Sequence, residues 1–104
     1  MNFILIPFDR GTRMVQAEEI IRVESLSNYS KIFFVRGNPI TVAKVLHWFE
    51  DNLPVQMFAR VHRSHLVNKI FVHKINRNKY ANLLLTNGER IPISRRKRIF
   101  MKTV

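Results

Sequence analysis

The chain has no cysteine, and this absence excludes disulfide bonds, thiolate chemistry and cysteine-based zinc sites. It also has no apolar run long enough to span a bilayer, since the longest stretches are Phe3 to Phe8 and Ile32 to Val35. No basic segment is followed by a longer apolar one, so no secretory signal peptide is predicted. A cytoplasmic protein fits these absences best.

Glycine and proline are scarce too, with 3 and 4 residues among 104, and this argues against a disordered or low-complexity chain. Hydrophobic residues make up 46% of the sequence, which is enough for a packed core. The length and the lack of any linker composition predict a single domain over residues 1–104.

Acidic residues are the most informative shortage, because 7 Asp and Glu face 18 Lys and Arg, for a formal net charge of +11. Residues 1–52 hold six basic and six acidic side chains, whereas residues 53–104 hold twelve basic ones and one acidic one, Glu89. Such an asymmetry predicts a polyanionic partner on one region of the surface. A basic surface that only aids solubility is the alternative, but solubility does not require the charge to be concentrated in one half.

Short apolar or β-branched runs separated by turn signals predict a mostly β protein. One internal helix is expected over residues 44–52, with Val45, Trp48 and Phe49 on its buried face and Leu53 continuing that face. Ser94 is expected to cap a closing helix from Arg95 to about Lys102. Strands are expected at 2–6, 13–16, 20–24, 29–35, 40–42, 58–61, 70–75, 80–86 and 90–93, with a helical turn at 17–19 and a hairpin turn at Asn87-Gly88.

The segment 59–68 gathers side chains that donate hydrogen bonds. Arginine can grip guanine and asparagine can grip adenine through paired hydrogen bonds, while serine and histidine suit phosphate oxygens. Arg63 is interpreted as a ligand contact and Asn68 as a local backbone partner, while both roles stay open for His62. The donors are Arg60, His62, Arg63, Ser64, His65 and Asn68.

The run Ser94-Arg95-Arg96-Lys97-Arg98 places four basic residues in the expected first turn of a helix. Cations are unfavourable there, because the helix N-terminus carries a partial positive charge. The run is explained if these side chains converge on phosphate; a solvated basic face is the alternative. A third segment, 25–31, is rich in small polar donors around Tyr29, and Asn76-Arg77-Asn78-Lys79 is read as a solvated hairpin tip.

Other chemistries find little support. His62 and His65 have a spacing that could suggest a metal, but no carboxylate follows nearby and no metal site is predicted. The acidic residues form adjacent pairs, Glu18-Glu19 and Glu50-Asp51, that look like solubilising helix ends rather than an acid–base couple. No glycine-rich phosphate loop or nucleophile elbow is present, so neither an enzyme nor a cofactor is predicted.

Four segments, taken in order, resemble the LytTR DNA-binding domain family. They are Glu-Glu-Ile-Ile-Arg-Val-Glu-Ser-x-Ser-Asn-Tyr (18–29), Val-Ala-Lys-Val-Leu (42–46), Phe-Ala-Arg-Val-His-Arg-Ser-His-Leu-Val-Asn (58–68) and Asn-Gly-Glu-Arg-Ile-Pro-Ile-Ser-Arg-Arg (87–96). The resemblance extends from about Ile4 to Phe100. It implies stacked antiparallel sheets with a short helix, and loops rather than a recognition helix that enter successive major grooves of double-stranded DNA.

The resemblance also implies a transcriptional regulator of the two-component response-regulator type, with two copies on promoter direct repeats. Family members usually carry an N-terminal receiver or sensor module, and none is expected within residues 1–104. The DNA-binding residues expected from the charge argument and the resemblance together are Asn28, Tyr29, Ser30, Lys31, Lys44, His62, Arg63, Ser64, His65, Arg95, Arg96 and Arg98.

Two other partners could explain the charge. An RNA- or ribosome-associated module would expose aromatic residues on a sheet face, whereas Phe33, Phe34, Trp48, Phe49 and Phe71 are assigned here to the core. A membrane partner is not predicted, because no basic amphipathic helix has an apolar face suited to lipid.

Overall fold

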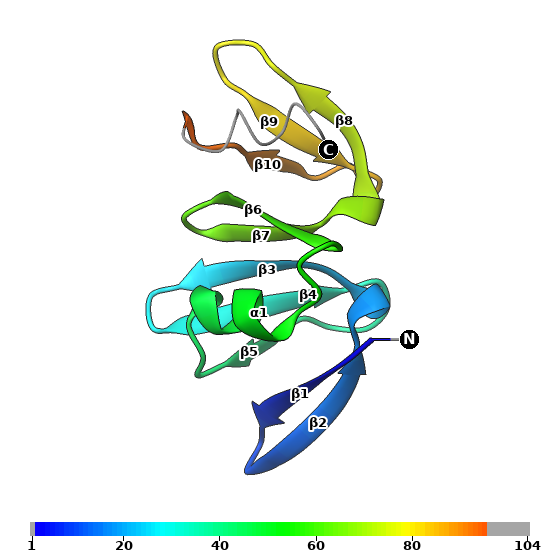
Figure 1. Ribbon diagram of the computed structural model, residues 1–104, viewed down its shortest axis with the longest axis vertical. Coiled ribbons are helices and arrows are strands. Elements are labelled where there is room, and N and C mark those ends of the chain that lie inside the picture. The colour runs from blue at the N-terminus through cyan, green and yellow to red at the C-terminus, as the bar shows by residue number, and fades with distance from the viewer. Residues whose placement is uncertain (1, 96–104) are drawn as a thin grey trace.

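The computed structural model describes residues 2–95, and in this part of the chain ten strands form three antiparallel sheets (Figure 1). The sheets stack along the long axis of a molecule that measures 44 × 27 × 22 Å. They are β1–β2, the five-stranded sheet β5-β4-β3-β7-β6, and β10-β9-β8. The elements are β1 Phe3–Phe8, β2 Gly11–Gln16, η1 Ala17–Glu19, β3 Ile20–Leu26, β4 Tyr29–Phe34, β5 Ile40–Val42, α1 Leu46–Asn52, β6 Phe58–His62, β7 His65–Asn68, η2 Lys69–Phe71, β8 Val72–Asn76, β9 Asn82–Leu85 and β10 Arg90–Pro92.

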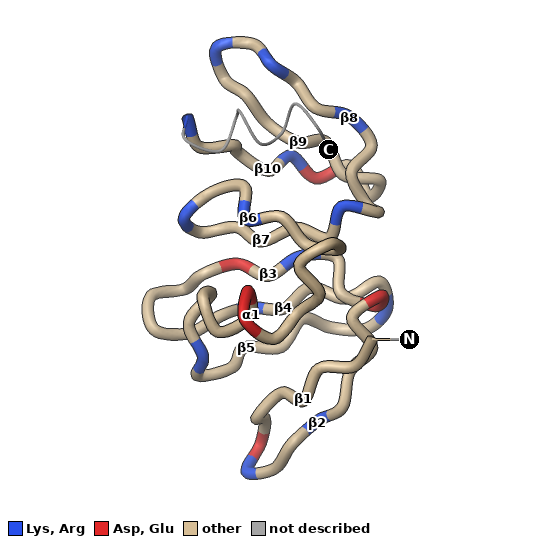
Figure 2. Tube along the Cα trace, in the orientation of Figure 1, with Lys and Arg blue, Asp and Glu red and all other residues tan. Residues whose placement is uncertain are grey.

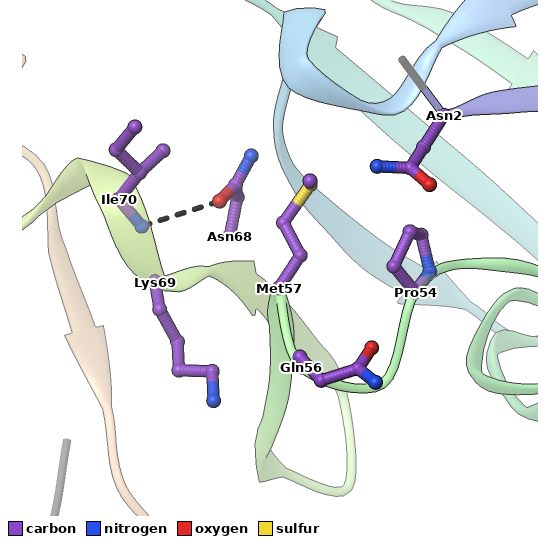
Figure 3. Close-up of a pocket in the computed structure, with 7 residues that line it drawn as sticks. All are labelled: Asn2, Pro54, Gln56, Met57, Asn68, Lys69 and Ile70. Carbon is purple, nitrogen blue, oxygen red and sulfur yellow. Dashed lines mark hydrogen bonds between the residues drawn. The ribbon is translucent and has the colours of Figure 1, made fainter.

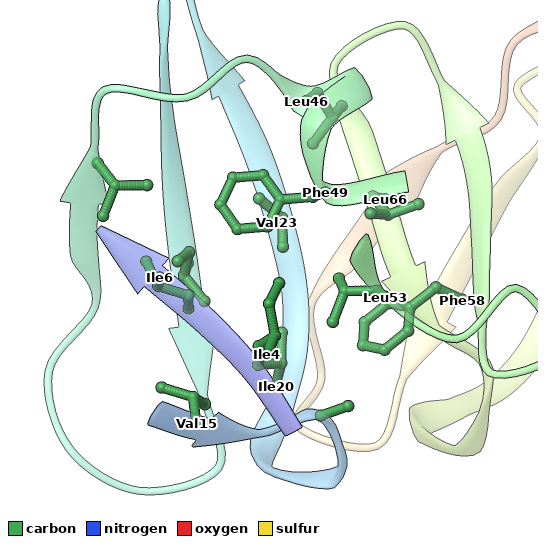
Figure 4. Close-up of a cluster of buried hydrophobic side chains, with 13 residues drawn as sticks. Ile4, Ile6, Val15, Ile20, Val23, Leu46, Phe49, Leu53, Phe58 and Leu66 are labelled. Atoms are coloured by element: carbon green, nitrogen blue, oxygen red, sulfur yellow. The ribbon is translucent and has the colours of Figure 1, made fainter. Parts of the chain in front are cut away.

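The side-chain alternation of the five-stranded sheet builds two separate cores. Successive residues of a strand point to opposite faces, so Leu66 joins one core and Val67 joins the other. The first core lies between this sheet, α1 and β1–β2, and Figure 4 shows Ile4, Val23 and Phe49 meeting there. The second core holds Val61 and Val67 together with Ala81, Leu83, Leu85, Ile91 and Ile93 from the β8–β10 region.

An ion pair ties the second core's two layers together. Arg22 of β3 is 6% exposed, and its guanidinium donates to both carboxylate oxygens of Glu89 at 3.1 and 2.8 Å. The remaining terminal nitrogen of the guanidinium donates to Glu24 at 2.8 Å. The central guanidinium carbon, Cζ, lies 3.7 Å from the ring centroid of Phe33. The single acidic residue of the basic half therefore neutralises a buried cation between two sheets.

Most of the expected elements are confirmed, including the stacked antiparallel sheets, the internal helix and the helical turn at 17–19. The strand at Phe58 and the one at Tyr29 begin where the sequence placed them. The strand predicted over 70–75 is instead η2 followed by β8. The predicted closing helix lies outside the described residues apart from Arg95.

The predicted buried face of the helix is confirmed for Phe49 and Leu53, which are buried, and Trp48 packs half-buried against the same core. It was wrong for Val45: helix α1 begins at Leu46, so Val45 is its N-cap residue and is 48% exposed. Leu46 takes its place in the core. Among the five aromatic residues assigned to the core, only Phe49 is fully buried; Phe33, Phe34, Trp48 and Phe71 are half-buried.

Candidate nucleic-acid interface

Three of the chain's turns emerge along one edge of the stack, at the left of Figure 1. Two are hairpin turns, Ser27-Asn28 between β3 and β4 and Arg63-Ser64 between β6 and β7. The third is the segment that follows β10. Because β3 and β7 are hydrogen-bonded neighbours, the two hairpin turns lie at the same end of one sheet.

Two backbone hydrogen bonds connect the segments that carry these turns. The N–H of Ser25 donates to the carbonyl oxygen of Ser64 at 2.9 Å, which links the β3–β4 end to the β6–β7 turn. The N–H of Ser94 donates to the carbonyl oxygen of Val61 at 2.9 Å, two residues before Arg63. Arg95 therefore stands beside the β6–β7 turn, although the two segments are some thirty residues apart in sequence.

Lys44 reaches the same region through Ser30. Ser30 is fully buried in β4, and its hydroxyl donates to the carbonyl oxygen of Lys44 at 2.6 Å. This bond fixes the segment between β5 and α1 against the start of β4. The Lys44 ammonium nitrogen lies 5.4 Å from the ring centroid of Trp48, so its aliphatic stem rests along α1.

The expected contact residues fall into three groups by exposure. Fully exposed residues can reach a duplex without rearrangement, half-buried ones present only part of their side chains, and buried ones support the edge from inside. Asn28, Tyr29, Arg63 and Arg95 are exposed; Lys31, Lys44, His62, Ser64 and His65 are half-buried; Ser30 is buried. Arg96 and Arg98 lie outside the described residues.

The two histidines pack against each other inside the β6–β7 hairpin, with ring centroids 5.4 Å apart. Nδ1 of His62 accepts a hydrogen bond from the N–H of Ser64 at 3.1 Å and so shapes the turn. Burial lowers the pKa of His65 below its ordinary value, although the carboxylate of Glu24 at 3.8 Å acts in the opposite direction. His65 is therefore neutral near pH 7. Within residues 2–95 no group of three His, Asp or Glu side chains could hold a metal ion.

Sequence reasoning assigned no role to the contact between Arg60 and Glu50. Arg60 of β6 donates to the carbonyl oxygens of His62 and Arg63 and also pairs with the Glu50 carboxylate of α1. The acidic pair at 50–51 was read as a solubilising helix end. Only the placement of α1 over the five-stranded sheet shows that Glu50 faces inward to β6.

Basic segments lie on both long edges of the molecule (Figure 2). On the turn edge they mark the β6–β7 turn and the end of the described chain. Away from it they mark η2 and β8. There too, the N–H of Val35 donates to the carbonyl oxygen of Glu19 at 2.9 Å, so the exposed Arg36 lies near acidic residues of η1. The turn edge thus gathers part of the basic surface of residues 2–95.

A surface hollow at the other end of β7 shows how its polar atoms are already used (Figure 3). It has a volume of about 370 Å³ and is lined by Asn68, Met57 and Pro54 among others. The buried Asn68 donates from Nδ2 to the carbonyl oxygen of Ile20 at 3.0 Å and accepts from the N–H of Ile70 at 3.2 Å. The local backbone role predicted for Asn68 is confirmed.

As for membranes, residues 2–95 contain no helix with the length and apolarity to cross one.

Comparisons with known proteins agree with this architecture. The LytTr DNA-binding domain of a response regulator from Bacillus cereus superposes with a TM-score of 0.82 at 23% identity, covering 99% of this chain and 95% of that one. This likeness shows a shared fold.

The sequence relatives are proteins named sensory transduction protein LytT. The one from Enterococcus faecalis is 30% identical over 81 residues, or 76% of this chain and 34% of its own length. The one from Bacillus anthracis is 29% identical over 97 residues, or 91% of this chain and 39% of its own length. The chain thus spans little more than a third of the length of these curated relatives. The family described as LytTr DNA-binding domain matches residues 10–103, and the chain therefore belongs to the LytTR family of DNA-binding domains.

Proposed function

We propose that the chain binds double-stranded DNA sequence-specifically as the promoter-reading domain of a bacterial transcriptional regulator, with its turns in successive major grooves. The observation that supports this is the pair of backbone hydrogen bonds that link the segments bearing Asn28, Arg63 and Arg95. The long axis of 44 Å supports the groove assignment, because one turn of B-DNA rises about 34 Å.

The exposed residues are assigned to base edges. The guanidinium groups of Arg63 and Arg95 suit the O6 and N7 atoms of guanine, and the carboxamide of Asn28 suits adenine. Phosphate oxygens are assigned to Lys31, Lys44, His62, Ser64 and Tyr29, with Arg96 and Arg98 extending this set beyond the described residues. Ser30 is assigned to support from within, because it is buried and its hydroxyl donates to the carbonyl oxygen of Lys44. His65 is assigned the same role, because only 15% of its side chain is exposed.

The biological setting follows from the relatives. The chain matches about a third of the length of sensory transduction proteins named LytT. This similarity supports control by a two-component signal in the cytoplasm. Two copies are expected on direct repeats, each with its own complete array of turns. No cofactor or catalytic step is needed for this role.

Selection from a random duplex library tests the proposal most directly. We expect enrichment of one motif repeated at a helical-turn spacing. An RNA-binding role would instead appear as preferential competition by single-stranded RNA over duplex DNA. A library without an enriched motif would contradict sequence-specific binding.

Arg63→Ala tests the base-reading role on the selected motif. We expect a loss of roughly 1–3 kcal/mol in binding, with relaxed preference at one position, in fluorescence-anisotropy titrations. Arg36→Ala removes the same charge from an exposed position on the opposite edge and serves as the control. An equal loss on selected and random duplexes would show that Arg63 contributes charge without reading a base.

A further inference from the structure

We infer that Arg60 and Glu50 are positioning residues that hold the β6–β7 turn, and with it Arg63, in its DNA-reading geometry. This inference rests on the proposed function. Neither residue is expected to touch DNA, so their effect passes through the backbone of the turn.

The guanidinium of Arg60 bridges three acceptors. Its Nε donates to the carbonyl oxygen of His62 at 3.0 Å, and one terminal nitrogen donates to the carbonyl oxygen of Arg63 at 2.5 Å. The other terminal nitrogen donates to Oε1 of Glu50. Because the guanidinium is a rigid planar fork, fixing one side by Glu50 fixes the direction of the other donors.

The turn is therefore held from two sides. Arg60 binds the carbonyl oxygens of His62 and Arg63, while Ser64 accepts from the N–H of Ser25 on the neighbouring hairpin. Glu50 is itself anchored, since its helix buries Leu46 and Phe49 in the first core. A path of direct contacts thus runs from the core through α1 to the backbone of the residue assigned to read a base.

Electrostatics alone would disfavour Glu50 at this place. Its carboxylate lies one side chain away from a turn that meets a polyanion, and an acidic group there repels phosphate. Arg60 has 21% of its side chain exposed and is paired with Glu50 at 32%, so it is a poor free cation for DNA. We therefore interpret the pair as structural. If only charge mattered, removing Glu50 would raise the affinity for DNA; if Glu50 positions the turn, removing it should lower the discrimination between duplexes.

Glu50→Ala and Asp51→Ala form a matched pair for that experiment. Both remove one carboxylate from α1, both leave a good helix former, and both carboxylates lie within 3.6 Å of the His47 ring nitrogens. Only Glu50 contacts Arg60; Asp51 is 63% exposed. Glu50→Gln keeps an oxygen that can accept from Arg60, and Arg60→Lys keeps the charge while losing the planar fork.

The measured quantity is the ratio of dissociation constants for the selected and the scrambled duplex, taken with one protein preparation. An inactive fraction then cancels from the ratio. We expect Glu50→Ala and Arg60→Lys to reduce this discrimination by about tenfold, the size of one lost charged hydrogen bond. Asp51→Ala should keep the wild-type ratio, and Glu50→Gln should restore most of it.

Equal ratios for Glu50→Ala, Asp51→Ala and the wild type would overturn the positioning role. So would a uniform gain in affinity on both duplexes for the two alanine variants, because that is the result expected from charge alone. A wild-type protein without discrimination between the duplexes would instead overturn the proposed function itself.

Discussion

At the scale of single residues, Arg22 is stabilised by two carboxylates. Glu24 lies two residues along the same strand, and Glu89 comes from a distant part of the sequence. Burial disfavours the charged form of its guanidinium, but the hydrogen bonds that it donates to Glu89 and Glu24 outweigh this and raise its pKa. In return, the hydrogen bonds from Arg22 lower the pKa of Glu89 below its ordinary value of 4.5. The pair therefore makes the stability of the fold depend on pH in the acidic range.

Glu89→Gln should lower the free energy of unfolding at pH 7 by about 1–2 kcal/mol, because it removes the negatively charged partner of Arg22. Solvent screening keeps this loss small, since the Glu89 side chain is 37% exposed. Because the folded pKa is depressed, the stabilising contribution is complete above the ordinary carboxyl pKa and is lost as pH falls through the folded value. Thermal unfolding of both proteins across the acidic range should show their difference shrinking on acidification. Glu19→Gln, at an exposed position, is the control; a constant difference at every pH would refute the linkage.

Individual site residues could be predicted only where local signals carry them. Arg63 was predicted as a DNA contact from the hydrogen-bond donors gathered in 59–68 and from the family resemblance, and its exposed place in the β6–β7 turn is compatible with that prediction. The backbone role of Asn68 was predicted from the local turn and is confirmed. The burial of Ser30 and the contact of Arg60 with Glu50 depend on α1 lying against the sheet. No spacing rule reports such a contact. The sequence therefore placed Ser30 among the expected DNA contacts although it is buried, and it gave Arg60 no partner on the helix.

At the scale of elements, the β1–β2 turn contains a strained residue. Asp9 and Arg10 both have positive φ, 50° and 64°, in a two-residue turn whose geometry favours glycine at the second position. Arg10→Gly should stabilise the protein by about 0.5–1 kcal/mol, because relief of the left-handed strain exceeds the entropy cost of glycine. Chemical denaturation would measure the gain.

Arg13→Gly supplies the comparison for that turn. It removes the same charge two positions into the same hairpin, but from an extended residue of β2. Glycine inside a strand lowers stability, so this variant should unfold at lower denaturant concentration. If the two variants changed stability in the same direction, charge removal would explain the result better than backbone conformation.

The internal helix shows why the existence of an element was predictable while its start, and with it part of its buried face, was not. The spacing of the apolar residues between 45 and 53 predicts a helix. Two overlapping faces fit that spacing, one that includes Val45 and one that includes Leu46. The choice depends on where the helix begins, and neither Val45 nor its neighbours offers a side-chain cap. The start at Leu46 is instead set by tertiary packing against β3 and β7, which the sequence pattern does not contain.

At the scale of the whole molecule, the stacking of three sheets brings Arg63 and Arg95 of the basic half-sequence to the turn edge, while Lys69 and Lys74 of the same half lie on η2 and β8. Alternating apolar residues predicted sheets, but they could not predict that one sheet would divide two cores. Nor could composition show that Glu89 would pair with the buried Arg22 rather than with cations at the surface. The formal charge of +11 therefore overstates what any one DNA duplex meets.

The salt dependence of binding should report this edge rather than the total charge. If about five phosphates are neutralised, the logarithm of affinity should fall with the logarithm of salt at a slope near −4 to −5. Lys31 and Lys69 are both half-buried lysines, but Lys31 follows the β3–β4 turn whereas Lys69 follows the opposite end of β7. Lys31→Gln should make the slope shallower by about 0.9, and Lys69→Gln should leave it unchanged. Titrations at several salt concentrations that gave both variants the same slope would mean that DNA senses the overall charge, and that the turn edge has no privileged role.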